Sequence, residues 1–323
     1  MNNLTLSGKI SGFFACFLLL VVSASAQVSL RTALDYDKDG KADYSVFRPS
    51  NNTWYILNSA GGVTFVRFGD TTDDTLTPGD YDGDGKSDIS VFRDSNGAWY
   101  RLNSSNGAFS AVQFGASGDE PVARDYDGDG KTDQAVARSS NGKITWYVLG
   151  STRGFFSAQF GNTGDFVAPG DYDGDGKFDF AVQRPGATDT AQATFFILRS
   201  RDGLQVTPWG LSKDNVVPGD YDGDGKTDVA VVRPGVTATD NLVWYILKSS
   251  NNGLLAESFG VSGTDYTVQN DYDGDGKTDV AVWRDSRDGT NGVFYYIRTS
   301  NRSLGVVPWG SSDDLPVASY DTH

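Results

Sequence analysis

The sequence is organised around a nine-residue acidic segment that occurs six times. Each copy carries aspartate at positions 1, 3, 5 and 9 and glycine at position 6, as in the segment from Asp80 to Asp88. Four like charges in such a short turn repel one another unless a cation lies among them. Oxygen-only ligands on a flexible turn favour a hard cation, and Ca2+ fits them best. We therefore predict calcium in all six segments, which begin at Asp35, Asp80, Asp125, Asp171, Asp220 and Asp271.

Two other interpretations of this segment are less consistent with the sequence. An EF-hand loop opens in the same way, but it needs a carboxylate at position 12 and flanking helices. A metal-free Asp-Gly turn would explain one copy, whereas six copies with the same four acids favour calcium. Position 12 is valine in every copy, so a strand follows the loop: Val46, Val91, Val136, Val182, Val231 and Val282.

The spacing of the copies predicts a repeat architecture. Successive segments begin 45, 45, 46, 49 and 51 residues apart, a period typical of solenoids, propellers and arrays. In each period a short apolar stretch enters the acidic segment and an alternating run follows it. An aromatic strand comes next, then a turn and a last strand. Such a unit of four short strands, without any sustained helical period, predicts an all-β chain folded as a β-propeller with four-stranded blades.

Aromatic residues mark the third and fourth strands of each predicted blade. We expect the aromatic third strands at 54–57, 99–102, 146–149, 195–198, 244–247 and 295–298. The fourth strands end in Phe-Gly or Trp-Gly, at Phe68, Phe114, Phe160, Trp209, Phe259 and Trp309.

The end of the chain leaves the number of blades open. The strand that enters the acidic segment occurs a seventh time, at Leu315–Asp321, whereas the other three strands occur six times. Six blades plus one spare strand is the simplest account, with the spare strand overlapping the first blade as a closure. A seventh, incomplete blade is the alternative.

The repeated unit resembles a known family. The segment at 220–231 reads Asp-Tyr-Asp-Gly-Asp-Gly-Lys-Thr-Asp-Val-Ala-Val, and together with Phe-Gly at the blade ends it resembles the FG-GAP repeat. This family overlaps the VCBS-repeat proteins of bacteria and the propeller of integrin α-chains. The resemblance covers nearly all of residues 30–321 and implies a β-propeller that binds Ca2+ between the first and second strands of each blade. The sequence departs from the pattern at Lys38, where glycine is usual, and at Phe195-Phe196, where Trp-Tyr is usual.

The resemblance also implies the metal ligands of each loop. They are the side chains at positions 1, 3, 5 and 9 and the backbone carbonyl of the lysine at position 7. The implied ligands are Asp35, Asp37, Asp39, Lys41, Asp43, Asp80, Asp82, Asp84, Lys86, Asp88, Asp125, Asp127, Asp129, Lys131, Asp133, Asp171, Asp173, Asp175, Lys177, Asp179, Asp220, Asp222, Asp224, Lys226, Asp228, Asp271, Asp273, Asp275, Lys277 and Asp279. We expect the lysine ammonium groups to face solvent.

An arginine ends the second strand of every predicted blade, and it has two interpretations. The six guanidinium groups could form a ring for an anionic ligand, or each could pair with the acid that follows Phe-Gly or Trp-Gly. One arginine and one acid per blade favour ion pairs. The arginines are Arg48, Arg93, Arg138, Arg184, Arg233 and Arg284, and the expected partners are Asp73, Asp119, Asp165, Asp214, Asp265 and Asp314.

The N-terminus has the pattern of a secretory signal. Lys9 precedes an apolar run from Phe13 to Val22, followed by the small residues Ala24-Ser25-Ala26. This run is about half the ~20 residues that a spanning helix needs. We therefore predict a signal peptide at 1–26, a propeller domain at 27–323 and a secreted, extracellular protein without a membrane span in the mature chain. The only cysteine, Cys16, lies in the predicted signal.

Charge narrows the choice of partners. The formal charge of −15 is offset largely by the +12 that six calcium ions would add, so the acidity does not require a basic partner. The sequence has no basic stripe, which argues against nucleic acid. We expect a monomer that binds an extracellular protein or glycan.

The sequence favours a protein that is not an enzyme. Its only histidine is His323, and 24 of its 42 acidic residues lie in the acidic segments. No period carries a distinctive, unrepeated cluster of the kind that general acid–base catalysis uses. We therefore expect a non-catalytic binding or adhesion scaffold. The alternatives are a carbohydrate-binding, lectin-like propeller, in which one exposed aromatic ring per blade stacks on sugars, and an extracellular polysaccharide lyase or hydrolase.

Overall fold

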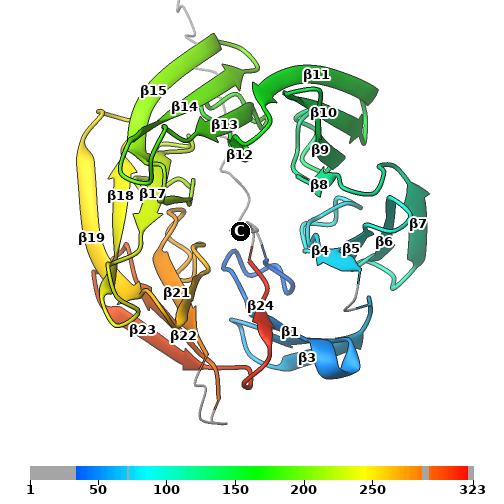
Figure 1. Ribbon diagram of the computed structural model, residues 1–323. Coiled ribbons are helices and arrows are strands. Elements are labelled where there is room, and N and C mark those ends of the chain that lie inside the picture. Colours follow the sequence, from blue (N-terminus) through cyan, green and yellow to red (C-terminus); the bar gives the residue numbers. More distant parts are fainter. Residues whose placement is uncertain (1–33, 71–72, 286–290, 319–323) are drawn as a thin grey trace, which may run out of the picture.

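The computed structural model is a closed ring of six antiparallel sheets with four strands each (Figure 1). It describes residues 34–70, 73–285 and 291–318. Within these ranges the only helical element is the single 3-10 turn η1 (Pro49–Asn51). The sheets are the blades of a six-bladed β-propeller, as the repeat period predicts.

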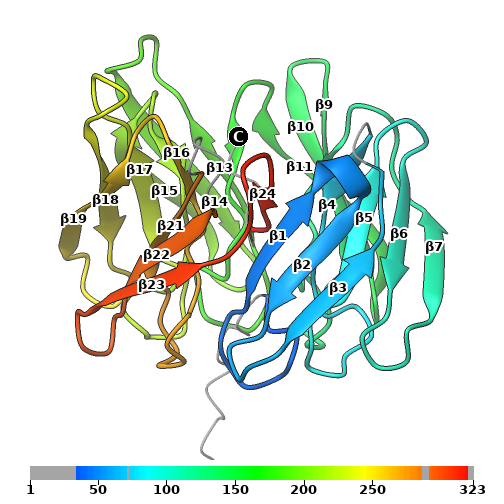
Figure 2. The same cartoon turned by 90° about the horizontal axis from the view of Figure 1, so that it is seen from below.

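The first strand of each blade is short and lies nearest the axis, and the fourth lies at the rim (Figures 1 and 2). The first three blades are β24 (Leu315–Pro316), β1 (Tyr44–Arg48), β2 (Thr53–Leu57) and β3 (Val63–Arg67); β4 (Asp74–Leu76), β5 (Ile89–Arg93), β6 (Ala98–Leu102) and β7 (Phe109–Gln113); and β8 (Glu120–Pro121), β9 (Gln134–Ser140), β10 (Lys143–Gly150) and β11 (Gly154–Asn162). The other three are β12 (Phe166–Val167), β13 (Phe180–Arg184), β14 (Gln192–Arg199) and β15 (Gly203–Leu211); β16 (Asn215–Val216), β17 (Val229–Arg233), β18 (Asn241–Leu247) and β19 (Leu254–Val261); and β20 (Asp265–Thr267), β21 (Val280–Arg284), β22 (Val293–Ile297) and β23 (Leu304–Pro308).

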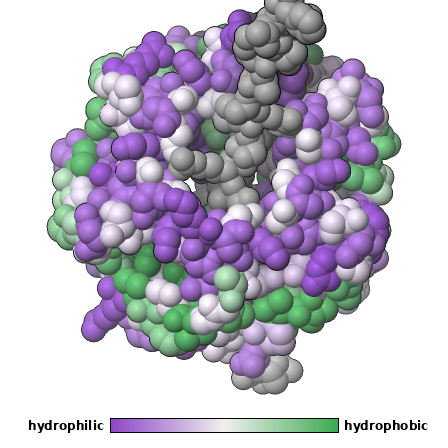
Figure 3. Space-filling model, turned by 180° about the vertical axis from the view of Figure 1, so that it is seen from behind, coloured by the Kyte–Doolittle hydropathy of each residue, from purple (hydrophilic) through white to green (hydrophobic). Residues whose placement is uncertain are grey.

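The apolar pattern of each strand follows its place in the blade. Second strands such as β5 are buried on both faces, third strands alternate between buried and half-buried, and fourth strands alternate between half-buried and exposed. The buried faces of neighbouring blades pack together, so that Trp54 and Ile56 of one blade meet Ile89 and Val91 of the next. Seen from behind, the molecule is mostly hydrophilic, with hydrophobic residues along parts of its rim (Figure 3).

The Phe-Gly at the end of a blade has a structural reason. Gly161 has a φ of +106°, a left-handed conformation that strains any other residue. A Cβ atom at this position would also lie 3.1 Å from Val182 Cγ1 of the next blade. Glycine therefore lets the end of one blade approach the valine at position 12 of the following loop.

The C-terminal strand closes the ring and settles the number of blades. β24 pairs with β1, with Leu315 opposite Phe47 and Pro316 opposite Val46. The N–H of Val317 donates to the carbonyl of Ser45 at 2.9 Å. Figure 1 shows β24 beside β1, where the two ends of the described chain meet. The spare strand is thus the first strand of the first blade, as the closure hypothesis predicted.

The predicted aromatic strand of the last blade was wrong by one residue. Val282 lies opposite Tyr295, and Trp283 lies opposite Phe294. Phe294, not Tyr295, therefore occupies the position of the tryptophans in other blades, and it is buried. Tyr296 therefore occupies the position that Ile56 holds in the first blade, and it packs with Tyr44 of the neighbouring blade.

The predicted signal peptide at 1–26 lies outside the described residues. Within the described residues, no helix combines the length and apolar character that crossing a membrane requires.

Ring closure by β24 can be tested with one substitution. Val317 is 1% exposed, so Val317→Ala should lower the free energy of unfolding by roughly 2 kcal/mol through lost burial and a residual cavity. Val306→Ala, at a site 49% exposed on β23, should change it by less than about 0.5 kcal/mol. Urea denaturation followed by tryptophan fluorescence measures both. If both substitutions lowered the free energy of unfolding equally, ring closure would not depend on the last strand.

Candidate metal centre

The aspartate at position 9 anchors each acidic loop to its blade. Asp88 is fully buried, and its two carboxylate oxygens accept hydrogen bonds from the N–H of Tyr81 at 2.9 Å and of Ser104 at 2.6 Å. Tyr81 lies in the loop, whereas Ser104 lies in the hairpin between the third and fourth strands. The same two bonds recur at Asp43, Asp133, Asp179, Asp228 and Asp279.

The aspartate at position 1 sets the curvature of the loop. Asp80 accepts hydrogen bonds from the N–H groups of Gly83 and Gly85, at 2.6 and 2.9 Å. Both glycines have a positive φ, which explains their place in the motif. In the first loop Lys38 adopts the left-handed conformation at position 4, with a φ of 68°.

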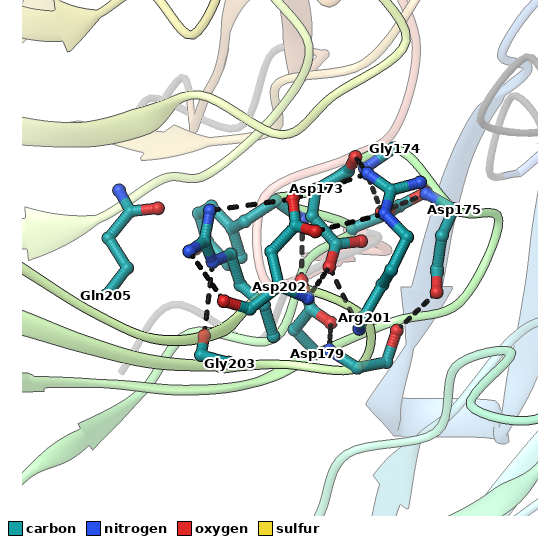
Figure 4. Close-up of polar contacts among 12 residues, drawn as sticks. Asp173, Gly174, Asp175, Asp179, Arg201, Asp202, Gly203 and Gln205 are labelled. Atoms are coloured by element: carbon teal, nitrogen blue, oxygen red, sulfur yellow. Dashed lines mark hydrogen bonds and ion pairs between the residues drawn. The ribbon is translucent and has the colours of Figure 1, made fainter.

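The acids at positions 3 and 5 reach the hairpin between the third and fourth strands, as Figure 4 shows for the fourth loop. Asp173 Oδ2 accepts from the N–H groups of Arg201 and Asp202, at 3.0 and 2.9 Å. Asp175 Oδ2 accepts from the hydroxyl of Ser200 at 2.6 Å. Positions 3, 5 and 9 of the loop are thus all held by one hairpin.

These bonds bring three carboxylates of a loop together. In the described residues, one oxygen from each acid of a group lies within 4.8 Å of the others. Most groups combine positions 1, 3 and 9, and the first combines positions 1, 3 and 5. Five of these groups are Asp35, Asp37 and Asp39; Asp80, Asp82 and Asp88; Asp125, Asp127 and Asp133; Asp171, Asp173 and Asp179; and Asp220, Asp222 and Asp228. Each group could hold a metal ion.

Electrostatics and hydrogen bonding support that interpretation. Burial raises the pKa of Asp43 and Asp133 to about 6 and that of Asp179 and Asp228 to about 7, because the charged form loses its hydration. One buried oxygen of the acid at position 3 has no hydrogen-bond partner in three loops: Asp127 Oδ1, Asp173 Oδ1 and Asp222 Oδ1. Buried carboxylate oxygens rarely lack a partner, so an oxygen-preferring cation fits these groups.

Neighbouring loops are joined into a continuous ring by backbone hydrogen bonds. In each case the N–H at position 8 of one loop donates to the carbonyl at position 1 of the preceding loop, at 2.7 Å. The six bonds run from Ser87 to Asp35, Thr132 to Asp80, Phe178 to Asp125, Thr227 to Asp171, Thr278 to Asp220 and Ala42 to Asp271. Because each bond joins the backbones of two loops, the backbone conformation of one loop constrains that of its neighbour.

The position-7 lysines lie along the same ring. A Cβ atom at Gly83 would lie 2.6 Å from Cε of Lys131 in the next loop. The aliphatic stem of this lysine thus covers the preceding loop, where it adds positive charge beside the acids. That the position-7 carbonyls bind metal stays a prediction.

The arginines at the ends of the second strands are ion-paired, as the stoichiometry predicted. Arg138 contacts both oxygens of Asp119 at 2.6 and 2.7 Å, and its guanidinium lies 4.9 Å from the ring centre of Tyr147. One expected partner was wrong: Arg93 pairs with Asp74 and not Asp73, because Asp74 lies opposite it in the strand register. Arg48 pairs with Asp314 and so adds an ion pair to the ring closure. The pairs and stacked rings occupy the guanidinium groups, which argues against an anion-binding ring.

Sequence reasoning missed the hairpin hydroxyls that bind the loops. In every blade a serine or threonine lies five residues after the buried Trp or Phe of the third strand, as Ser59 does after Trp54, and its hydroxyl donates to the position-5 acid. These residues are Ser59, Ser104, Ser151, Ser200, Ser249 and Thr299. Their constant offset from this aromatic residue is a signal that could have identified them.

Comparison with known proteins supports the family resemblance. Residues 35–91 and 125–182 match the FG-GAP-like repeat, so these two segments carry repeats of that family. No curated protein sequence matches the chain.

Solved structures share the fold. A triple arginine-to-alanine mutant of AofleA from Arthrobotrys oligospora has a TM-score of 0.51 and 11% identity, over 84% of this chain and 87% of that chain. The Tc holotoxin pore of Photorhabdus luminescens has a TM-score of 0.50 and 16% identity, over 88% of this chain and 14% of that chain. At these identities the similarity is one of fold alone.

The raised pKa values predict how stability depends on pH in the absence of divalent cations. The folded protein binds more protons than the unfolded chain between pH ~4 and 7, so the stabilisation is complete below pH ~4 and is lost as pH rises through 6–7. In EDTA, the melting temperature should be lower at pH 8 than at pH 5. Asp179→Asn should reduce this difference, and Asp189→Asn, at an exposed site, should not. Calorimetry at constant ionic strength measures it, and a melting temperature that rises with pH would contradict the prediction.

Proposed function

We propose, from the matched FG-GAP-like repeats and the preformed acid groups, that this protein is a secreted propeller that binds Ca2+ in its acidic loops. In this proposal it is a non-catalytic scaffold that binds or adheres to an extracellular protein or glycan. The observation that carries the proposal is the buried, unpartnered carboxylate oxygen at position 3 in three of the six loops. The hydrogen bonds of the loop satisfy the other acids and leave this oxygen for a cation.

Calcium is favoured over other cations by the donor set. The candidate ligands are all oxygens, and they lie on irregular loops that can adjust their spacing. Ca2+ accepts six to eight oxygen ligands in flexible geometry, whereas Mg2+ requires a stricter octahedron and is reluctant to lose water. Transition metals favour nitrogen and sulfur, and the acidic segments contain neither histidine nor cysteine.

Secretion and a scaffold function are supported by separate observations. The first 26 residues have the pattern of a signal peptide, and extracellular calcium modules often have a Kd of roughly 10⁻⁴ to 10⁻³ M. The repeated acids and arginines are engaged in loop anchoring and ion pairs, which are structural contacts. These features favour a rigid scaffold over a catalyst.

Removing calcium should destabilise the protein strongly. At a ligand concentration about tenfold above Kd, each site contributes ~1.4 kcal/mol. Six such sites would contribute ~8 kcal/mol if they were additive, which is comparable to the net stability of a domain. EDTA should therefore lower the melting temperature by many degrees at pH 7.5, and added CaCl2 should restore it. An unchanged melting temperature would refute the calcium assignment.

A substitution in one loop should remove one site. Asp222→Asn removes a charge from a position-3 acid with an unpartnered buried oxygen, so the bound calcium should fall from six ions per chain to five. Asp189→Asn removes an equal charge at an exposed site outside the loops and should leave six. Atomic emission analysis after gel filtration counts the ions, and equal counts for the two variants would contradict the site.

Calcium binding should be cooperative. Each loop donates a hydrogen bond to the position-1 residue of the preceding loop, so that ordering one loop positions a backbone group of the next. A calcium titration followed by tryptophan fluorescence should therefore give a Hill coefficient above 1. A fit to independent sites with a coefficient of 1 would show that the ring does not couple them.

A further inference from the structure

Two of the six junctions between blades depart from the pattern of the repeats. At most junctions, the loop tyrosine at position 2 packs with one apolar residue of the third strand and one that begins the next blade's second strand. These apolar junctions contain Tyr36, Ile56 and Ile89; Tyr126, Val148 and Phe180; Tyr172, Ile197 and Val229; and Tyr221, Ile246 and Val280. At the junction of the second and third blades the equivalent positions hold Tyr81, Arg101 and Gln134, and the guanidinium of Arg101 lies 5.3 Å from the ring centre of Tyr81. The junction between the last blade and the first has tyrosine at all three positions: Tyr272, Tyr296 and Tyr44.

The three tyrosines form a compact cluster. Tyr44 stacks on Tyr272 with ring centres 5.3 Å apart, and the ring centres of Tyr272 and Tyr296 are 5.0 Å apart. The hydroxyls of Tyr44 and Tyr296 are 2.9 Å apart and share a hydrogen bond. The Tyr272 hydroxyl donates to the Val268 carbonyl at 2.7 Å. The Tyr296 hydroxyl also accepts a hydrogen bond from Nη2 of Arg298 at 3.3 Å. A tyrosine hydroxyl has one donor and two acceptor positions, so the Tyr44 and Tyr296 hydroxyls keep hydrogen-bonding capacity for a ligand.

A cavity of about 410 Å³ lies against this cluster. The first blade contributes Lys41 and Ser59 to its wall, and the last blade contributes Arg298, Ser300 and Asn301. This volume is within the range of small-molecule sites. The wall combines hydroxyls, an amide and two cations with the edges of aromatic rings.

The two cations of the cavity are available for an anion. The guanidinium of Arg298 lies 5.1 Å from the ring centre of Tyr296, and its Nη1 donates to Ser303 Oγ and the Leu304 carbonyl, both at 3.0 Å. These contacts fix its position. In the described residues, neither Arg298 nor Lys41 forms an ion pair with a carboxylate, whereas the six strand-ending arginines all do.

The remaining charge in the cavity is Asp273, at position 3 of the sixth loop. Its Oδ2 accepts a hydrogen bond from the Ser300 hydroxyl at 2.6 Å. Under the proposed function, on which this step rests, a bound cation neutralises that carboxylate. The cavity then has a net positive charge.

We propose that this cavity binds an acidic saccharide, and specifically a uronate. The sugar carboxylate lies between Arg298 and Lys41, and the sugar hydroxyls bind Ser59, Asn301 and the tyrosine hydroxyls. A guanidinium matches a carboxylate in a two-point geometry, and hydroxyl and amide groups match the many donors and acceptors of a sugar. The last blade and the first contribute to this site together, so it forms only when the ring is closed.

Calorimetry with defined disaccharides tests the proposal. Digalacturonate is titrated into the protein in excess CaCl2, with a blank titration into buffer, and galactobiose is the neutral counterpart. Digalacturonate should bind at least about tenfold more tightly than galactobiose, because charge-assisted hydrogen bonds are lost with the neutral sugar. No binding of digalacturonate, or equal binding of the two, would overturn the proposal.

Variants identify the site. Arg298→Ala should weaken digalacturonate binding about tenfold or more. Arg199 occupies the same strand position in the fourth blade and contacts its own hairpin at Gly203 and Asp202, so Arg199→Ala should leave affinity unchanged. Tyr44→Val with Tyr296→Ile recreates the apolar junction of Val280 and Ile246, and it should retain the calcium-dependent melting temperature while losing affinity. Undiminished binding by Arg298→Ala would refute the assignment.

The outcomes separate the two proposals. The shift in melting temperature caused by EDTA is measured on the same samples. A shift without digalacturonate binding refutes the saccharide site and leaves the calcium-binding scaffold intact. No shift refutes the calcium proposal itself.

Discussion

The structure depends on how four carboxylates are kept together within nine residues. Positions 1 and 9 are held by backbone N–H groups, as at Asp80 and Asp88, and position 5 is held by a hairpin hydroxyl. Only the acid at position 3 keeps an unpartnered buried oxygen, in three of the loops. The bonds that Ser104 donates to Asp88 and Asp84 also fix the loop against the hairpin between the third and fourth strands. The geometry that gathers the charge is therefore also the geometry that aligns the blade.

The same loops connect one blade to the next. The backbone bonds from position 8 to position 1 form a closed ring, because the bond from Ala42 to Asp271 joins the first loop to the last. A second closure, between β24 and β1, involves the strand pairing and the ion pair of Arg48 with Asp314. In an open array of repeats the first and last repeats each lack one neighbour. Here both closures bring the first and last blades together, so that each is the other's neighbour.

Much of the fold could be predicted from the sequence because repetition reduces ambiguity. One acidic segment is a weak signal, whereas six at a nearly constant period predict blades, loops and strand order. The errors arose where a repeat departs from the others. In the last blade the tryptophan moves to the second strand as Trp283 and phenylalanine takes its usual place, so matching by residue type placed the register one residue late. Asp74 was missed because two adjacent aspartates look equivalent in sequence, and only the pairing with Arg93 distinguishes them.

The candidate metal ligands could be predicted because they are close in sequence, but the tyrosine cavity could not. Tyr44 and Tyr296 are 252 residues apart and meet only when the ring closes. Repetition also helps to separate structural residues from candidate ligand-binding residues. A residue that recurs in every blade, such as the ion-paired arginine, has a role that every blade needs, and that role is structural. Arg298 lies beside the three-tyrosine junction and forms no ion pair within the described ranges, although its strand position recurs in other blades. Apolar residues fill the equivalent positions at four other junctions, so packing does not require tyrosines there, and the proposed ligand gives the hydroxyls of Tyr44 and Tyr296 a role.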